Sequence, residues 1–220
     1  MPSRSGPTQA TRPLRADALR SIERILDAAV EELSLDPDAG MAAIAQRAGV
    51  VRATLYVHFP TREALIGAVG DLAIAEAADA IRGANPDEGD PREAVARVLH
   101  AAWRTVGRYH ALVTLATREG RGSDHRFHGP VLQQIAPLLR RGQASGAFNP
   151  DVPPRWLLTL CLELIHAASR EVSEGRMSAR SAEDALVASL LGALSPLRAH
   201  RATTPVNGPS AQGPRRTRRR

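Results

Sequence analysis

The sequence contains no lysine, a single cysteine and few aromatic residues. All 29 basic residues are arginine, so every motif that needs a lysine is excluded, including the phosphate-binding P-loop. The lone Cys161 excludes an intramolecular disulfide. No apolar run is long enough to span a bilayer, and nothing before Asp17 resembles the apolar core of a signal peptide. These absences predict a cytoplasmic protein without a membrane segment.

The composition favours α-helices over β-sheets. Hydrophobic residues make up 43% of the chain and aromatic residues only 3%, whereas a β-sandwich needs more aromatic and β-branched residues. The net charge of +6 has a specific location, because residues 201–220 hold six arginines and no acid. The rest of the chain is neutral, with 23 acidic residues matched by 23 arginines. The basic character is therefore a property of the tail and is not evidence for a basic folded domain.

Hydrophobic periodicity divides the chain into two tails and two helical domains. Residues 1–16 and 198–220 are rich in proline, small polar residues and arginine, and we expect both tails to be disordered. Residues 17–66 are expected to form an N-terminal domain, and residues 67–197 a C-terminal helical domain. A polar loop at 83–91 is a second candidate boundary. The helices expected in the C-terminal domain lie near 92–107, 109–119, 130–145, 153–174 and 179–194. The predicted fold class is all-α.

The segment from Met41 to Leu65, MAAIAQRAGVVRATLYVHFPTREAL, predicts a helix-turn-helix. Two short helical stretches flank a turn that contains glycine. At about 100° per residue, Leu55 and Phe59 point together toward the preceding helices, while Ala53 and Val57 point away from them. A second helix with such an exposed face is typical of proteins that place it in the DNA major groove.

The candidate DNA contacts fall into three chemical classes. The guanidinium of Arg52 matches guanine O6 and N7, a pairing worth about 1–3 kcal/mol of base discrimination. The small apolar side chains of Ala53 and Val57 match thymine methyl groups. Side chains suited to phosphate oxygens are those of Thr54, Tyr56, His58 and Arg62.

This segment resembles the DNA-binding segment of the tetracycline-repressor (TetR) family. The shared pattern is Ile-Ala-x-x-Ala-Gly-Val, then Thr-Leu-Tyr-x-His-Phe, then a basic residue and an acid before Ala-Leu. The matching residues are Ile44, Ala45, Ala48, Gly49, Val50, Thr54, Leu55, Tyr56, His58, Phe59, Arg62, Glu63, Ala64 and Leu65. The resemblance spans about Ile22 to Val69. It implies a ligand-responsive transcriptional regulator, most often a repressor, without a cofactor.

The chain departs from the family pattern in two places. The family commonly has serine or threonine after the Ala-Gly-Val turn to cap the third helix, where this chain has Val51. It also often begins the second helix with a hydroxyl residue and a basic residue, which residues 40–43 do not supply. We therefore expect Arg52 to carry more of the sequence readout.

A single helix-turn-helix reads few base pairs, so useful specificity requires a homodimer on a palindromic operator. Apolar stripes in the helices near 153–174 and 179–194 predict the dimer interface. Because the scarce aromatic residues gather in the C-terminal half, we also expect a pocket there for a small, largely apolar effector. The candidate lining residues are Trp103, Tyr109, His110, Phe127, Leu162 and His166, and Trp156 belongs to the same aromatic group.

The sequence gives little support to other functions. It has no nucleophile elbow, zinc-protease motif or dinucleotide fingerprint, so no enzyme activity is predicted. His125 and His128 have the spacing of helical metal ligands but lie among glycines, and no metal is predicted. Cys161 is most simply a small buried hydrophobic residue. The alternatives are a helical small-molecule-binding protein without a DNA function, and a nucleoid-type binder that depends on the arginine-rich tail.

Overall fold

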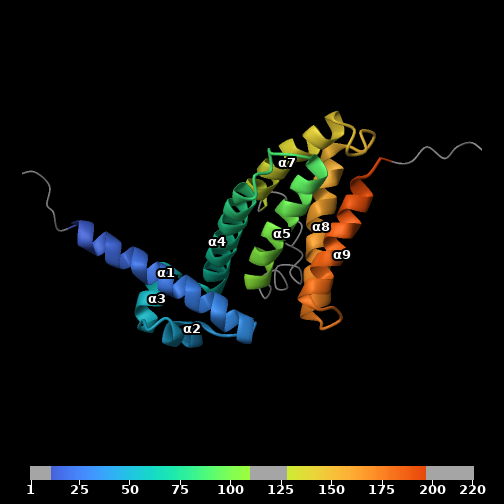
Figure 1. The fold of residues 1–220 in the computed structure, drawn as a ribbon. Helices are drawn as coiled ribbons and strands as arrows, with labels where there is room; N and C mark the ends of the chain where they lie inside the picture. Colours follow the sequence, from blue (N-terminus) through green and yellow to red (C-terminus); the bar gives the residue numbers. More distant parts are fainter. Residues whose placement is uncertain (1–10, 110–127, 197–220) are drawn as a thin grey trace, which may run out of the picture.

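The computed structural model describes residues 11–109 and 128–196. Every regular element in these ranges is an α-helix, which confirms the predicted all-α class (Figure 1). The N-terminal helices are α1 (Thr11–Leu35), α2 (Met41–Arg47), α3 (Arg52–His58) and α4 (Arg62–Gly83). The C-terminal helices are α5 (Pro91–Arg108), α7 (Gly129–Ala144), α8 (Pro154–Ser173) and α9 (Ala179–Leu194). None of the described helices is long and apolar enough to cross a membrane.

Helix α1 begins earlier in the chain than the sequence predicted. Disorder is expected up to residue 16, but α1 begins at Thr11, so residues 11–16 are helical. The helix expected at 109–119 lies outside the described residues, apart from Tyr109, which caps the C-terminus of α5. The remaining parts of both tails are also outside the described ranges.

The helix starts follow from capping residues in the sequence. The Thr61 hydroxyl accepts a hydrogen bond from the Ala64 N–H at 3.1 Å and begins α4. The Asp90 carboxylate accepts from the N–H of Arg92 at 2.8 Å and begins α5. Such side chains satisfy the free N–H groups of a first helical turn. At the start of α3, Val51 makes no capping hydrogen bond, because a valine side chain has no polar atom.

The buried residues form two hydrophobic cores, and α4 belongs to both. Its first half contributes Leu65 and Val69 to the N-terminal core with α1, α2 and α3. Its second half contributes Ala78 and Ile81 to the C-terminal core with α5, α7, α8 and α9. The two cores thus meet inside one helix, and the loop at 83–91 is not the boundary, because it joins two helices of the C-terminal core.

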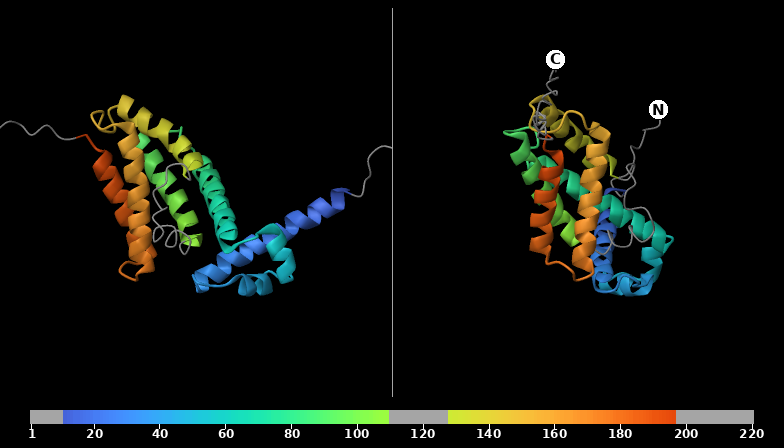
Figure 2. Two further views of the ribbon diagram at one scale, coloured as in Figure 1. Left: turned by 180° about the vertical axis from the view of Figure 1, so that it is seen from behind. Right: turned by 90° about the vertical axis from the view of Figure 1, so that its right-hand side faces the viewer.

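The helices α8 and α9 lie side by side (Figure 2). Their strongest apolar stripes face the chain's own core. The core residues of these stripes are Leu157, Cys161, Ile165, Ala182, Leu186, Leu190 and Leu194. The exposed residues of α9 include a group of small ones: Ala185, Ala188, Ser189, Gly192 and Ala193. The core residues of the stripes that predicted a dimer interface therefore pack within one chain, while these small residues stay exposed.

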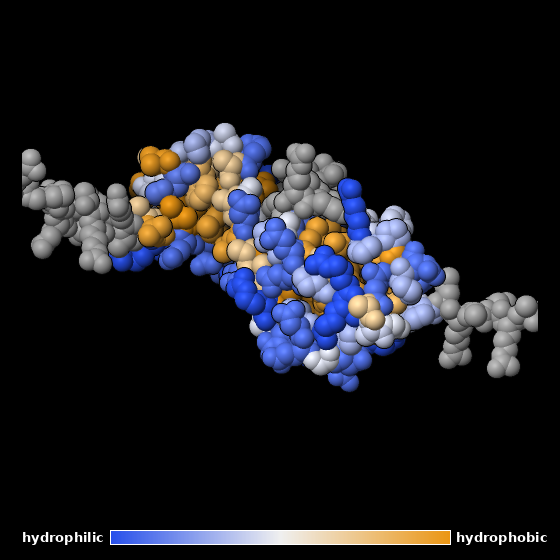
Figure 3. Space-filling model, turned by 90° about the horizontal axis from the view of Figure 1, so that it is seen from above, coloured by the Kyte–Doolittle hydropathy of each residue, from blue (hydrophilic) through white to orange (hydrophobic). Residues whose placement is uncertain are grey.

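The first part of α1 extends beyond the other helices (Figure 1). Leu19 on this part is 61% exposed, and the N-terminal core begins only at Ile22 and Ile25. Seen from above, hydrophobic residues gather on the side of α1, whereas the opposite end is largely hydrophilic (Figure 3). On the face seen from above, the two ends of the molecule thus differ in surface chemistry.

Candidate nucleic-acid interface

A glycine turn sets the angle between α2 and α3. Gly49 has a φ of +65°, a left-handed conformation that costs other residues energy because of their Cβ atoms. The turn is closed by the Gly49 N–H, which donates to Gln46 O at 3.1 Å, and by the Val50 N–H, which donates to Ala45 O at 3.0 Å. This local chemistry holds α3 across α2 as the helix-turn-helix prediction requires.

The two faces of α3 differ as the helical projection predicted. Leu55 is fully buried and Phe59 nearly so, and both belong to the N-terminal core. The opposite face is open to solvent, with Val57 77% exposed and Tyr56 44% exposed. Arg52 and Ala53 are exposed as well, and the partly buried residues of the helix are Thr54 and His58. A guanidinium, a phenol and two small apolar groups therefore share one free surface.

Arg62 does not stand free beside this surface. Its Nη2 donates to Pro37 O at 2.6 Å and its Nε donates to Ala39 O at 3.3 Å. The guanidinium thereby ties the start of α4 to the turn between α1 and α2. These two bonds use two of the five guanidinium N–H groups, and the expected phosphate contact of Arg62 stays a prediction.

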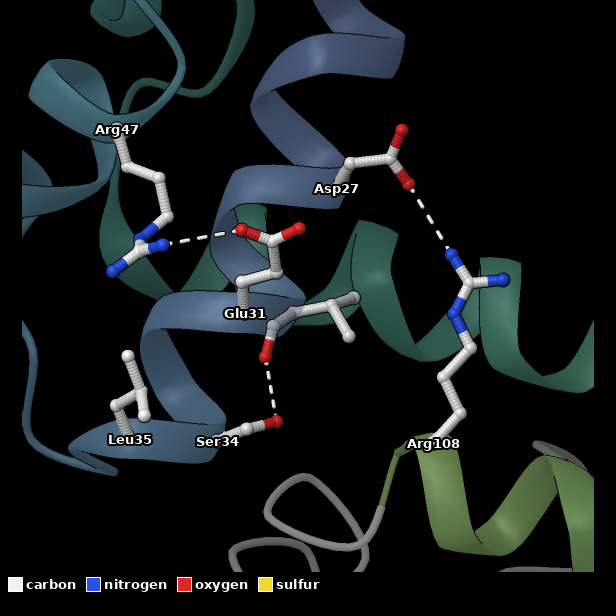
Figure 4. Close-up of a pocket in the computed structure, with 7 residues that line it drawn as sticks. Asp27, Glu31, Ser34, Leu35, Arg47 and Arg108 are labelled. Carbon is white, nitrogen blue, oxygen red and sulfur yellow. Dashed lines mark hydrogen bonds and ion pairs between the residues drawn. The ribbon is translucent and has the colours of Figure 1, made fainter.

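Arg47 makes a second tie within the domain that the sequence did not reveal. At the end of α2, its guanidinium donates to the carboxylates of Glu32 and Glu31 on α1, the latter at 3.2 Å (Figure 4). Arg47 is 15 residues from Glu32 and 16 residues from Glu31 in the chain, so no local sequence pattern predicts the contact. The bonds of Arg47 to Glu31 and Glu32 thus hold α2 against α1, and the bonds of Arg62 hold the start of α4 to the turn before α2.

The C-terminal end of α5 is anchored in the N-terminal core. Tyr109 is buried among residues of α1 to α4, although it follows a helix of the other core. Arg108 beside it donates to both Glu76 carboxylate oxygens, at 3.0 and 3.1 Å, and to Asp27 at 3.3 Å. Burial and the neighbouring Glu76 raise the pKa of Tyr109 to about 12. One short segment thus joins α1, α4 and α5.

An open cleft of about 700 Å³ lies beside this joint (Figure 4). Its described lining residues are Asp27, Val30, Glu31, Ser34, Leu35, Arg47 and Arg108. Its charged groups largely pair with one another or with neighbouring carboxylates. The cleft is therefore unlike the apolar effector pocket that the sequence predicted.

The residues expected to line an effector pocket separate into different surroundings. Trp103 is part of the C-terminal core and Tyr109 part of the N-terminal core. Leu162 and His166 are both buried and lie one turn apart on α8. Among the described residues of the six predicted to line the pocket, only these two are neighbours. His110 and Phe127 lie outside the described ranges. Trp156 is 60% exposed at the start of α8 and lines no interior space.

We expect the stability of the protein to fall between about pH 6.5 and pH 4 because of His166. Burial, followed by the nearby His128 and Arg170, lowers the pKa of His166 from 6.5 to about 4, against a smaller opposing effect of Glu163. In this window the unfolded chain binds a proton that the folded chain refuses, so the free energy of unfolding decreases as the pH falls. Urea titrations near pH 7 and pH 5 should show that His166→Leu removes about 2 kcal/mol of this difference. An identical pH dependence in the variant would contradict the assignment.

Comparisons with known proteins agree with the geometry of α2 and α3. The sequence profile described as "Bacterial regulatory proteins, tetR family" matches residues 25–69, the part of the chain that forms the N-terminal core. The chain belongs to the TetR family. It is a DNA-binding transcriptional regulator.

Solved structures resemble this TetR-family chain over most of its length. A TetR-family regulator from Shewanella sp. PV-4 is 28% identical, with 79% of this chain and 97% of that chain covered at a TM-score of 0.60. The TetR-like regulator LfrR from Mycobacterium smegmatis, solved with proflavine, is 25% identical, with coverages of 81% and 99% and a TM-score of 0.62. FadR from Bacillus subtilis, solved with stearoyl-CoA, shares the fold at 18% identity, with coverages of 78% and 98% and a TM-score of 0.65. None of the curated proteins matches the chain.

Proposed function

We propose that this regulator represses transcription by binding a palindromic operator as a homodimer and leaves it when a small, largely apolar effector binds the C-terminal helices. The observation that carries the proposal is the two-sided α3, whose inner face is buried while its outer face leaves Arg52, Ala53, Tyr56 and Val57 free. That outer face has the size and chemistry to read base edges in a major groove. The protein then acts by binding in the cytoplasm, without catalysis.

A dimer is needed because one recognition helix contacts too few base pairs for specificity. We propose that the exposed small residues of α9 and the adjoining surface of α8 pair with the same surface of a second copy. Small side chains let two helices approach closely, and a two-fold axis pairs each helix with its own copy. The two α3 helices would then be held at a fixed separation, which the operator half-sites must match.

The contacts of α4 and α5 offer a route by which effector binding in the C-terminal helices could change the position of α3. Effector binding must favour one arrangement of the helices over another through unequal affinity. The helix α4 is built into both cores, and α5 reaches the N-terminal core through Arg108 and Tyr109. A shift of either helix in the C-terminal core would move α3 with it and change the separation of the two recognition helices.

The proposal is tested by the Arg52→Ala variant of the full-length protein. We expect the variant to bind its preferred site about 1–3 kcal/mol more weakly and to lose discrimination at one or two positions per half-site. A selection from randomised DNA followed by affinity measurements checks both effects. Tyr56→Phe is the comparison, because loss of a phosphate contact should weaken all sequences similarly.

Arg140→Ala on α7 is the matched control, since this arginine is exposed and far along the chain from α3. It should leave the selected sequence and the affinity unchanged. If Arg52→Ala selects the same sequence as the wild-type protein with the same affinity, Arg52 does not read bases. If the wild-type protein selects no sequence at all, the proposed function is wrong.

A further inference from the structure

The helix α8 has a second buried face, distinct from the one that enters the C-terminal core. Leu157, Cys161 and Ile165 face the core. At about 100° per residue, Leu162, His166 and Ser169 lie roughly a quarter turn away, and all three are buried. This face is apolar at Leu162 and polar at His166 and Ser169, a combination that core packing alone does not require.

Two polar atoms on this face have no hydrogen-bond partner among the described residues. They are Nδ1 of His166, which is 8% exposed, and Oγ of Ser169, which is 3% exposed. Hydroxyl groups inside helices usually donate to a carbonyl of the preceding turn. On the same helix, Ser173 does so with Arg170 O at 3.0 Å, and Thr159 with Arg155 O at 3.2 Å. Ser169 is buried and yet does not do so.

A second imidazole lies next to this face. His128, at the start of α7, is also buried, and its ring centroid lies 5.3 Å from that of His166, with the ring planes 61° apart. The two rings mark the place where α7 and α8 approach each other. Burial keeps the pKa of His166 low, so its ring is neutral near pH 7 and offers one N–H donor and one nitrogen acceptor.

Buried polar atoms without partners destabilise the folded protein, and most proteins avoid them. Two such atoms on neighbouring turns of one helix indicate a surface that is completed by a bound molecule. A formal charge on that molecule is disfavoured, because it would have to be buried beside Leu162 and a neutral imidazole. An uncharged hydroxyl, carbonyl or amide group fits the available donor and acceptor atoms.

We propose that His166 and Ser169 bind the uncharged polar group of an otherwise apolar effector at the junction of α7 and α8. The inference rests on the proposed function, since it names the chemical class of the effector. Sites for small molecules are commonly apolar with a few convergent polar groups, and Leu162, His166 and Ser169 supply such a combination.

The first test uses probes that share one alkyl chain and differ only in the head group: n-octanol, octanoate and octylamine. Isothermal titration calorimetry with the full-length protein near neutral pH measures their affinities. We expect n-octanol to bind at least about tenfold more tightly than either charged probe, because only its head group escapes the cost of burying a charge. Equal or tighter binding of octanoate or octylamine, or no binding of n-octanol, would overturn the proposal.

The second test separates a binding role from a structural one. His166→Leu and Ser169→Ala should each weaken n-octanol binding about three- to tenfold, the value of one hydrogen bond to a neutral group. Both variants should melt at the wild-type temperature or higher without ligand, because each removes a buried polar atom that lacks a partner. Ser173→Ala, one turn further along α8, is the control and should leave n-octanol binding unchanged.

Unchanged n-octanol affinity in both variants would refute the site, and so would a lower melting temperature in both. DNA binding by the same protein samples is measured in parallel. Loss of n-octanol binding with DNA binding retained supports the site. A wild-type protein that binds n-octanol selectively but no DNA would contradict the proposed function and leave the head-group assignment standing.

Discussion

The Gly142→Ala variant should lose about 3 kcal/mol or more of its free energy of unfolding, a large effect for the addition of one methyl group. A Cβ atom at Gly142 would lie 1.9 Å from Cδ2 and 2.1 Å from Cε2 of Phe148. Phe148 is fully buried in the C-terminal core, and its N–H donates to Gly142 O at 2.9 Å. The ring therefore has no space into which it can move, and the clash must be relieved by displacing α7 or opening the core.

Urea denaturation of the wild-type and variant proteins measures this loss. Gly107→Ala is the matched control, because Gly107 is an exposed residue inside α5 and a Cβ atom there would meet no described atom within 4 Å. It should stabilise the protein by about 0.5–1 kcal/mol, since alanine favours a helix more than glycine does. The double variant Gly142→Ala, Phe148→Leu should recover part of the loss, because the two side chains interact directly. A Gly142→Ala protein as stable as the wild type would show that Phe148 does not cover this glycine.

The Tyr109→Ala variant should be destabilised by about 3–5 kcal/mol and should lose the coupling between effector and DNA. Removal of the ring leaves a cavity in the N-terminal core at the place where α5 enters it. It also removes the aromatic surface over which the Arg108 guanidinium lies, 5.4 Å from the ring centroid. The connection between the C-terminal helices and the DNA-binding helices is then weakened at the same point.

Tyr109→Phe separates the ring from its hydroxyl. The Tyr109 hydroxyl is buried near Glu76 but forms no hydrogen bond of normal geometry with the described residues. Its removal should therefore leave stability unchanged or slightly increased. Unfolding curves, and DNA titrations with and without effector, measure both variants. Tyr109→Ala with wild-type stability and a wild-type effector response would show that this contact does not link the two cores.

The sequence predicted those features that depend on neighbours along the chain. The inward positions of Leu55 and Phe59 follow from helical periodicity over a few residues. The outward face of α3 follows from the same periodicity. For this reason, most of the candidate DNA contacts could be named before their surroundings were known.

Features that depend on distant segments could not be predicted. Arg108 and Asp27 are 81 residues apart, and Arg62 reaches carbonyl groups 23 and 25 residues before it. Periodicity shows that a residue is buried but not which helix it packs against, so it cannot tell an effector pocket from the N-terminal core in which Tyr109 lies. For the same reason, periodicity could not show that the apolar stripe of α9 faces α8 and α5 of its own chain.

The division of α4 between two cores has a thermodynamic consequence. A helix cannot melt in its first half and remain fully formed in its second without losing hydrogen bonds at the junction, so the two cores are expected to open together as one cooperative unit. A molecule that binds tightly among the C-terminal helices would then also protect the amide hydrogens of α2 and α3 from exchange with solvent, although it touches neither helix.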